Sequence, residues 1–150
     1  MIRLEPATKR DLPFMFDTRN IPEVYEGFYT QTGPLDWEEH LAWWKSRPSS
    51  WRSYCVCDED LRVGVVTVGQ LEHWSPEIGY YIHPDYWGRG IGKLAVGMTI
   101  HGFLRAECCK KYCHTTVLKS NERSIRLLKS LGFEYMAEAR KGEIWMTKSL

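Results

Sequence analysis

The chain has 150 residues, 43% of them hydrophobic and 26% charged, which is typical of a globular domain long enough to bury a core. Its 20 basic and 19 acidic residues leave a formal net charge of +1, without the basic excess that nucleic-acid binders use to neutralise phosphates. No apolar run is long enough for a signal peptide or a membrane span, so we expect a cytoplasmic protein with no nucleic-acid or membrane partner.

The first third of the chain predicts a strand followed by helices. Residues 1–5 alternate apolar and polar side chains as a half-buried strand does, and Thr8 is placed to cap a first helix. A short helix is expected over 22–29, and a further helix between Asp36, which can cap its start, and Pro48, which stops it. Helical spacing places three apolar side chains of that last helix on one face, which we expect to pack inward: Trp37, Leu41 and Trp44.

The middle of the chain predicts three strands and one long helix. Apolar and β-branched runs predict strands over residues 51–57, 62–71 and 77–82, with an acidic turn between the first two. A helix with apolar residues on more than one side is expected from Ile91 to about Glu107.

The remaining elements complete a mixed α/β sandwich. A strand, an amphipathic helix and the two strands of a hairpin are expected over residues 112–118, 121–131, 133–138 and 143–146. Gly132 is placed to end the helix. No repeat, linker or low-complexity tract divides the sequence, so we expect a single domain over residues 1–150.

The cysteines indicate neither a disulfide framework nor a zinc finger. There are five, an odd number, and no CxxC pair occurs among them. Cys108, Cys109, Cys113 and His114 could be drawn as metal ligands, but they straddle a helix end and the next strand, with no second pair. We therefore expect no metal site and reduced, mostly buried thiols.

The segment WGRGIGK, residues 87–93, is the strongest local signal, and we call it the glycine loop. Backbone N–H groups at a helix N-terminus are unpaired, and glycines let a phosphate approach them without Cβ atoms in the way. Arg89 and Lys93 would add positive charge. The spacing excludes a P-loop, which needs glycine at Trp87, and a dinucleotide fingerprint, which needs glycine at Lys93. A glycine-rich turn without a ligand is the alternative.

A second motif, NERSIRLLKSLGF at residues 121–133, begins and ends a predicted helix. Together with GYYIHPDYWGRGIG at residues 79–92, it resembles the GNAT superfamily of acetyl-CoA-dependent N-acetyltransferases. The resemblance covers about residues 62–135. It implies a GNAT-like α/β fold with a mixed, largely antiparallel central sheet flanked by helices.

The resemblance also implies where acetyl-CoA binds. The pyrophosphate would lie on the loop and helix start formed by Gly88, Arg89, Gly90, Ile91, Gly92 and Lys93. The pantetheine arm would pair with the exposed strand edge at Tyr80, Tyr81 and Ile82, as a β-strand ligand does. The N–H of Ile82 would polarise the thioester carbonyl, and Asn121 would hydrogen-bond the cofactor arm. A helix cap is the alternative role for Asn121.

Two positions depart from the family pattern. Trp87 stands where Gln or Arg commonly opens the phosphate loop, which resembles the branch of ribosomal-protein N-terminal acetyltransferases. Leu128 stands where many members carry the tyrosine that protonates the leaving thiolate. Leucine cannot donate a proton, so the usual acid is missing; Tyr112 or Tyr135 could replace it, and the sequence does not choose between them.

The amine acceptor must lose a proton before it attacks, and Glu77 is the expected base. It begins the cofactor-binding strand, near where some family members keep a catalytic glutamate. Strand alternation places it on one face with Tyr81 and His83. Glu72, His73 and His114 are further candidates nearby, and a purely structural carboxylate is the alternative for Glu77.

The acceptor is expected to bind the N-terminal third of the chain. Arg19-Asn20, residues 37–40 and Trp43-Trp44 resemble bacterial members that acetylate nucleotide-linked amino sugars. Packing of these tryptophans on the sheet is the alternative, and a peptide N-terminus or another small amine stays open as the acceptor. A homodimer is compatible with the sequence, and a non-catalytic acyl-CoA-binding module is the contrasting function.

Overall fold

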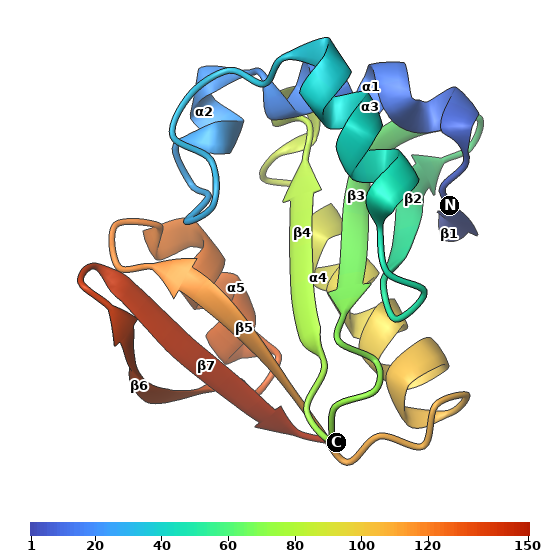
Figure 1. The fold of residues 1–150 in the computed structure, drawn as a ribbon. Helices are drawn as coiled ribbons and strands as arrows, with labels where there is room; N and C mark the ends of the chain where they lie inside the picture. The colour runs from blue at the N-terminus through green and yellow to red at the C-terminus, as the bar shows by residue number, and fades with distance from the viewer.

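The computed structural model describes residues 1–150, which form a seven-stranded sheet with helices on both faces (Figure 1). The strand order is β1-β2-β3-β4-β5-β7-β6, and every neighbouring pair is antiparallel except β4 and β5. The strands are β1 (Ile2–Pro6), β2 (Arg52–Asp58), β3 (Leu61–Gly69), β4 (Glu77–Ile82), β5 (Tyr112–Leu118), β6 (Glu134–Arg140) and β7 (Glu143–Ser149). The prediction of an α/β fold with a largely antiparallel sheet is confirmed.

The helices form two layers, one on each face of the sheet (Figure 1). They are α1 (Leu12–Arg19), α2 (Pro22–Tyr25), α3 (Trp37–Ser46), α4 (Ile91–Met98) and α5 (Glu122–Ser130). The N-terminal helices lie on one face, and α4 and α5 pack on the other around the main core cluster of 17 buried residues. None of these helices has the length and apolar character that a membrane crossing requires.

The core determines which side chains of β4 are free for other roles. Ile78 and Ile82 belong to the main core cluster, on the face covered by α4 and α5. Because strand side chains alternate, Glu77 and Tyr81 point to the opposite face, beneath the N-terminal helices. The predicted sharing of one face by Glu77 and Tyr81 therefore follows from the burial pattern.

Strands β4 and β5 are neighbours that hardly pair. Their only paired positions are Glu77 and His114, supported by a hydrogen bond from the His114 N–H to the Pro76 carbonyl. Beyond this point the two strands diverge, and Figure 1 shows the opening widening toward α2. The opening leaves one edge of β4 unpaired over most of its length.

Three helix predictions need correction at their boundaries. The helix expected over residues 22–29 is only Pro22–Tyr25. Thr8 caps a 3₁₀ turn, Lys9–Asp11, and not α1, which begins only at Leu12. The Asp11 carboxylate accepts hydrogen bonds from Thr8, and these hold the turn. Pro13 fits the first turn of α1, where a backbone N–H would have no acceptor within the helix.

The long helix predicted from Ile91 to Glu107 changes its hydrogen bonding after Met98. Residues Thr99–Arg105 are π-helical, and the Thr99 hydroxyl donates to the Ala95 carbonyl at 3.0 Å. The hydroxyl bond lies at the junction where the α-helical hydrogen bonding ends and the wider turns begin.

The inner face of α3 also differs from the prediction. Asp36 caps the helix as expected, but the buried residue is His40, at 2% exposure, whereas Trp37 is exposed. Leu41 and Trp44 are partly buried beside His40. A histidine does not count as apolar when the spacing of apolar residues is used to find the inner face. The predicted inner face therefore included Trp37 and left out His40.

Candidate active site

One cavity joins the parts of the predicted site. It has a volume of about 740 Å³ and runs from the glycine loop, along the opening between β4 and β5, to the underside of the N-terminal helices. Its walls include all of β4, residues 115–117 of β5 and four residues of α5 and its cap. A single space therefore connects a helix N-terminus with Glu77.

The glycine loop leaves its backbone accessible at two glycines. Gly88 and Gly90 have φ angles of +75° and +74°, a left-handed backbone conformation that residues other than glycine adopt only at an energetic cost. A Cβ at either position would meet nothing within 4 Å, and Gly90 is the N-cap of α4. Gly92 differs, because a Cβ there would lie 3.1 Å from the Leu127 side chain.

The two charged residues of the glycine loop, Arg89 and Lys93, lie differently with respect to the cavity. Lys93 lines the cavity together with Gly88, Gly90, Ile91 and Gly92. Arg89 does not line it, and its guanidinium lies over the Tyr86 ring at 5.3 Å. The predicted contribution of Arg89 to phosphate binding therefore needs its side chain to turn.

Trp87 joins the loop to its neighbours. Its indole Nε1 donates to the Ile82 carbonyl at 2.7 Å, and the Arg123 guanidinium lies 3.3 Å from its ring centroid. Arg123 lines the cavity, and no carboxylate acts on its charge. Trp87, which departs from the family pattern, thus ties the glycine loop to the end of β4 and holds the cation of Arg123 beside the loop.

The unpaired edge of β4 presents alternate backbone amides to the cavity. The N–H of His83 donates to Val63 of β3, so the alternation of an antiparallel pair directs the N–H of Tyr81 toward β3 as well. The N–H groups of Tyr80 and Ile82 then point the other way, toward the opening. The expected amide at Ile82 is therefore on the correct edge, and Tyr80 offers a second one.

The two tyrosine side chains of β4 lie on opposite faces. The Tyr80 hydroxyl forms a short hydrogen bond with Ser124 of α5. The Tyr81 hydroxyl is buried and has no hydrogen-bond partner, and burial raises its pKa, so it keeps its proton. Both residues line the cavity.

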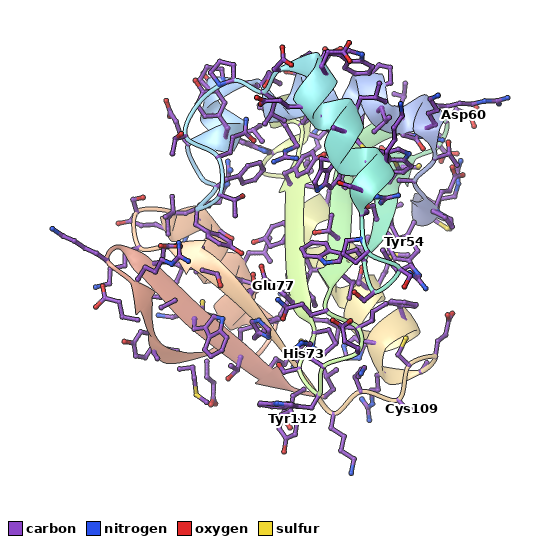
Figure 2. All side chains as sticks on the ribbon, viewed as in Figure 1. Tyr54, Asp60, His73, Glu77, Cys109 and Tyr112 are labelled. Carbon is purple, nitrogen blue, oxygen red and sulfur yellow. The ribbon has the colours of Figure 1, made fainter.

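Glu77 lies where β4 and β5 begin to diverge (Figure 2). The Tyr29 hydroxyl donates to its Oε1 at 2.6 Å, and His114 Nε2 lies 3.6 Å from its Oε2. Behind His114, its Nδ1 is 3.1 Å from the Ser75 hydroxyl. If Ser75 donates, the neutral ring carries its proton on Nε2, toward the carboxylate.

These contacts keep Glu77 ionised. Burial raises the pKa of the carboxyl group, but the nearby His114 side chain, 3.6 Å away, and the hydrogen bond from Tyr29 lower it by more, so the net shift is downward. The pKa of Tyr29 is raised by burial and by its bond to the carboxylate, so Tyr29 remains the donor.

The other candidates for the base lie outside the cavity wall. Glu72 and His73 are exposed and face each other at 3.8 Å, and Figure 2 shows His73 toward the end of the sheet where the C-terminus lies. His83 accepts a hydrogen bond from the Asp85 N–H and caps a 3₁₀ turn. His114 stands behind Glu77, so the structure brings together only Glu77 and His114.

Leu128, at the family's usual acid position, and the two tyrosines that could replace that acid all lie outside the cavity wall. Leu128 is fully buried in the main core cluster and does not line it. Tyr112 and Tyr135 are exposed, at 46% and 60%, and are not part of its wall. Tyr112 packs against Trp74 near the end of the sheet (Figure 2).

Asn121 fulfils the cap role that was the alternative for it. Its Oδ1 accepts from the Ser124 N–H at 3.2 Å, and its Nδ2 donates to the Gly27 carbonyl at 3.3 Å. A Cβ at Gly27 would lie 2.8 Å from Nδ2, so glycine permits this approach. Asn121 thereby joins α5 to the loop after α2 at the cavity wall.

Three contributors to the site are absent from the sequence predictions. Tyr29 donates to the Glu77 carboxylate, Ser75 is hydrogen-bonded to His114 behind it, and Arg123 stacks on Trp87. Each acts across a long stretch of chain, and no local motif marks it. Three of the cysteines are buried, as expected, but Cys109 is exposed, and no group of three or more ligating side chains could hold a metal.

The comparisons with known proteins agree with this geometry. A family profile described as an acetyltransferase (GNAT) domain matches residues 2–134. An uncharacterised protein of Methanocaldococcus jannaschii is 37% identical over 95% of this chain, and the chain spans only 30% of that protein's length.

Solved structures share the fold. A domain from Methanocaldococcus jannaschii superimposes with a TM-score of 0.91 at 33% identity, covering 100% of this chain and 99% of that one. The spermidine N-acetyltransferase of Vibrio cholerae, solved with CoA and spermine, gives a TM-score of 0.88 at 15% identity over 99% and 95% of the two chains. Because the family profile covers most of the sequence, the chain belongs to the GNAT acetyltransferase family, whose members take their acetyl group from acetyl-CoA.

Proposed function

We propose that this domain transfers an acetyl group from acetyl-CoA directly to a primary amine, with Glu77 as the base. The observation that carries the proposal is the continuous cavity, which has the glycine-lined N-terminus of α4 at one end and the Glu77 carboxylate, whose pKa is lowered, beside its path. In a direct transfer no nucleophilic side chain carries the acetyl group between donor and acceptor. The two substrates must therefore bind together in one space.

The residues present fit coenzyme A. Gly88 and Gly90 leave room for phosphate oxygens at the N-terminus of α4, and Lys93 and Arg123 supply positive charge on the wall. When bound, acetyl-CoA supplies the thioester carbonyl that an amine attacks. The outward amides of Tyr80 and Ile82 can pair with the amide groups of its arm.

The spacing along β4 bears on how the proton moves. At about 3.3 Å per residue, the amide of Ile82 lies roughly 16 Å along the strand from Glu77, and that of Tyr80 roughly 10 Å. A carbonyl held at either amide is beyond direct reach of the Glu77 side chain. We therefore propose that Glu77 accepts the amine proton through water, with Tyr29 and His114 as positioning residues.

The pH dependence should show one ionisation. The pKa of Glu77 is lowered, so the carboxylate is charged throughout the neutral and alkaline range, whereas an amine with a pKa near 10 is mostly protonated there. With Leu128 in the acid position, kcat/KM should rise with pH and then level off. A coenzyme A thiol, with a pKa of about 8.5 as for cysteine, can leave as the thiolate. A falling alkaline limb in the measured profile would show that a further group supplies a proton.

For the acceptor, we propose a nucleotide-linked amino sugar. Trp43 and Phe28 line the cavity at its N-terminal end and give it an aromatic wall against which a sugar or base can pack. Such an acceptor should have a kcat/KM roughly 10- to 100-fold above that of the same sugar without its nucleotide, because the remote part helps to position the amine. Comparable values for the two compounds, or a preference for a peptide N-terminus, would contradict this acceptor.

The function itself is tested by thiol release from acetyl-CoA with a broad panel of amines. We expect amine-dependent release with the acetylated amine as product. Tight binding of acetyl-CoA with no release on any amine would instead support a non-catalytic acyl-CoA-binding module.

A further inference from the structure

The end of the cavity farthest from the glycine loop contains a cation without a counter-ion. Arg19, the last residue of α1, lines the cavity, and its guanidinium lies 5.8 Å from the ring centroids of both Phe28 and Trp43. It forms no ion pair and donates no hydrogen bond within the protein, and no carboxylate acts on its charge. Burial lowers its pKa, but a guanidinium stays protonated in proteins.

Two buried polar side chains beside Arg19 also lack partners. The Tyr81 hydroxyl is buried with no hydrogen bond. His40 is 2% exposed, and neither of its ring nitrogens has a partner. Both residues line the same cavity and are close enough to Arg19 for its charge to act on their ionisation. Unpartnered polar groups in a fold are costly, and three in one place indicate that a ligand completes them.

The chemistry of these groups is that of an anion site. Burial, and then the charge of Arg19, lower the pKa of His40 by more than the nearby Leu12 backbone raises it, so the imidazole is neutral and Arg19 carries the positive charge. The guanidinium and the tyrosine O–H donate hydrogen bonds, which carboxylate and phosphate oxygens accept. Glu23 and Glu39 also line the cavity, but they are exposed and form no ion pair with Arg19.

We propose that Arg19, Tyr81 and His40 form a subsite for an anionic oxygen group of the acceptor, so that the amine substrate carries a carboxylate or a phosphate. The inference rests on the proposed amine acetylation and narrows it, because a polyamine has no group for this subsite. The rings of Phe28 and Trp43 lie within cation–π distance of the Arg19 guanidinium, 5.8 Å from each centroid, and help to hold it at the cavity wall.

Matched acceptor pairs test the subsite and separate its two sources of charge. An L-amino acid is compared with its carboxamide, and a nucleotide-linked amino sugar with the free amino sugar. Spermidine, a polyamine with no oxygen atom, serves as the control acceptor that cannot fill the subsite. We expect kcat/KM to favour the anionic member of one pair by about 10- to 100-fold. The pair that shows the preference identifies the group as carboxylate or phosphate. Equal rates in both pairs, or faster acetylation of spermidine, would overturn the subsite.

Variants then assign the preference to these residues. Arg19→Gln should abolish it while leaving the neutral acceptor within a few-fold and the affinity for acetyl-CoA unchanged. Arg47→Gln is the matched control, because Arg47 also stacks on Trp43 and Trp44 but does not line this cavity. An equal loss with anionic and neutral acceptors in Arg19→Gln would contradict the proposal.

Tyr81→Phe gives a readout that a structural role would not produce. Removing an unpartnered buried hydroxyl should leave the melting temperature unchanged or raise it, yet weaken binding of the anionic acceptor. Binding is measured by the melting-temperature shift that the acceptor causes in the presence of CoA, without turnover. A charge-dependent shift without acetylation would overturn the proposed function but support the subsite, and acetylation without a charge preference would do the reverse.

Discussion

Replacing Glu77 by glutamine should lower kcat/KM by about 10²–10⁴-fold, the usual contribution of a general base. Glutamine has nearly the same shape, and its carbonyl oxygen can still accept the Tyr29 hydrogen bond that the carboxylate accepts at 2.6 Å. It cannot take a proton from the acceptor. The melting-temperature shift caused by acetyl-CoA should remain, because Glu77 lies at the opposite end of β4 from the glycine loop.

One control variant and one assay condition separate the effect of losing the base from an effect on its surroundings. Tyr29→Phe keeps the carboxylate but removes its donor, so it should cost far less and should leave the pH profile with its single rising limb. Because the pKa of Glu77 is lowered, its ionised form stabilises the fold above the ordinary value near 4.3, and this contribution falls away as the pH drops. Glu77→Gln should therefore be assayed well below its melting temperature. A loss of only a few-fold would make Glu77 structural.

The sequence predicted those parts of the fold that local pattern determines. Every strand appears within a few residues of its expected range, because alternation and β-branched runs specify strands directly. The glycines of the glycine loop were expected to leave bare backbone at a helix start, and Gly88 and Gly90 do adopt the left-handed conformation that only glycine adopts readily. That the loop binds an anion stays a prediction.

What the sequence missed depends on contacts between distant segments. Tyr29 and Glu77 are 48 residues apart in the chain, and nothing near Tyr29 indicates a carboxylate partner. His40 counts as polar in a periodicity argument, so its burial beneath the aromatic side chains of α3 was not anticipated. The contacts of Trp87 with Arg123 and with the Ile82 carbonyl are formed only in the folded chain, so its role in joining the glycine loop to β4 could not be predicted.

Replacing Gly90 by valine should abolish the stabilisation that acetyl-CoA gives the wild-type protein. At a hundred times its dissociation constant, a ligand raises the free energy of unfolding by about 2.7 kcal/mol, and the shift in melting temperature reports this. A side chain at Gly90 would occupy the space in front of the α4 N-terminus, where phosphate oxygens would otherwise meet the backbone N–H groups. Gly92 is a poorer test, because a Cβ there would crowd Leu127 even without ligand.

Gly142→Val is the matched control for backbone strain. Gly142 has a φ of +81°, close to the +74° of Gly90, and a Cβ there also meets nothing within 4 Å, but it lies in the turn between β6 and β7, away from the cavity. Both variants should lose about 1–2 kcal/mol of stability, the cost of a left-handed conformation for a residue with a Cβ. Only Gly90→Val should also lose its response to acetyl-CoA. An undiminished response in Gly90→Val, or the same loss in Gly142→Val, would show that the phosphates do not bind at this helix N-terminus.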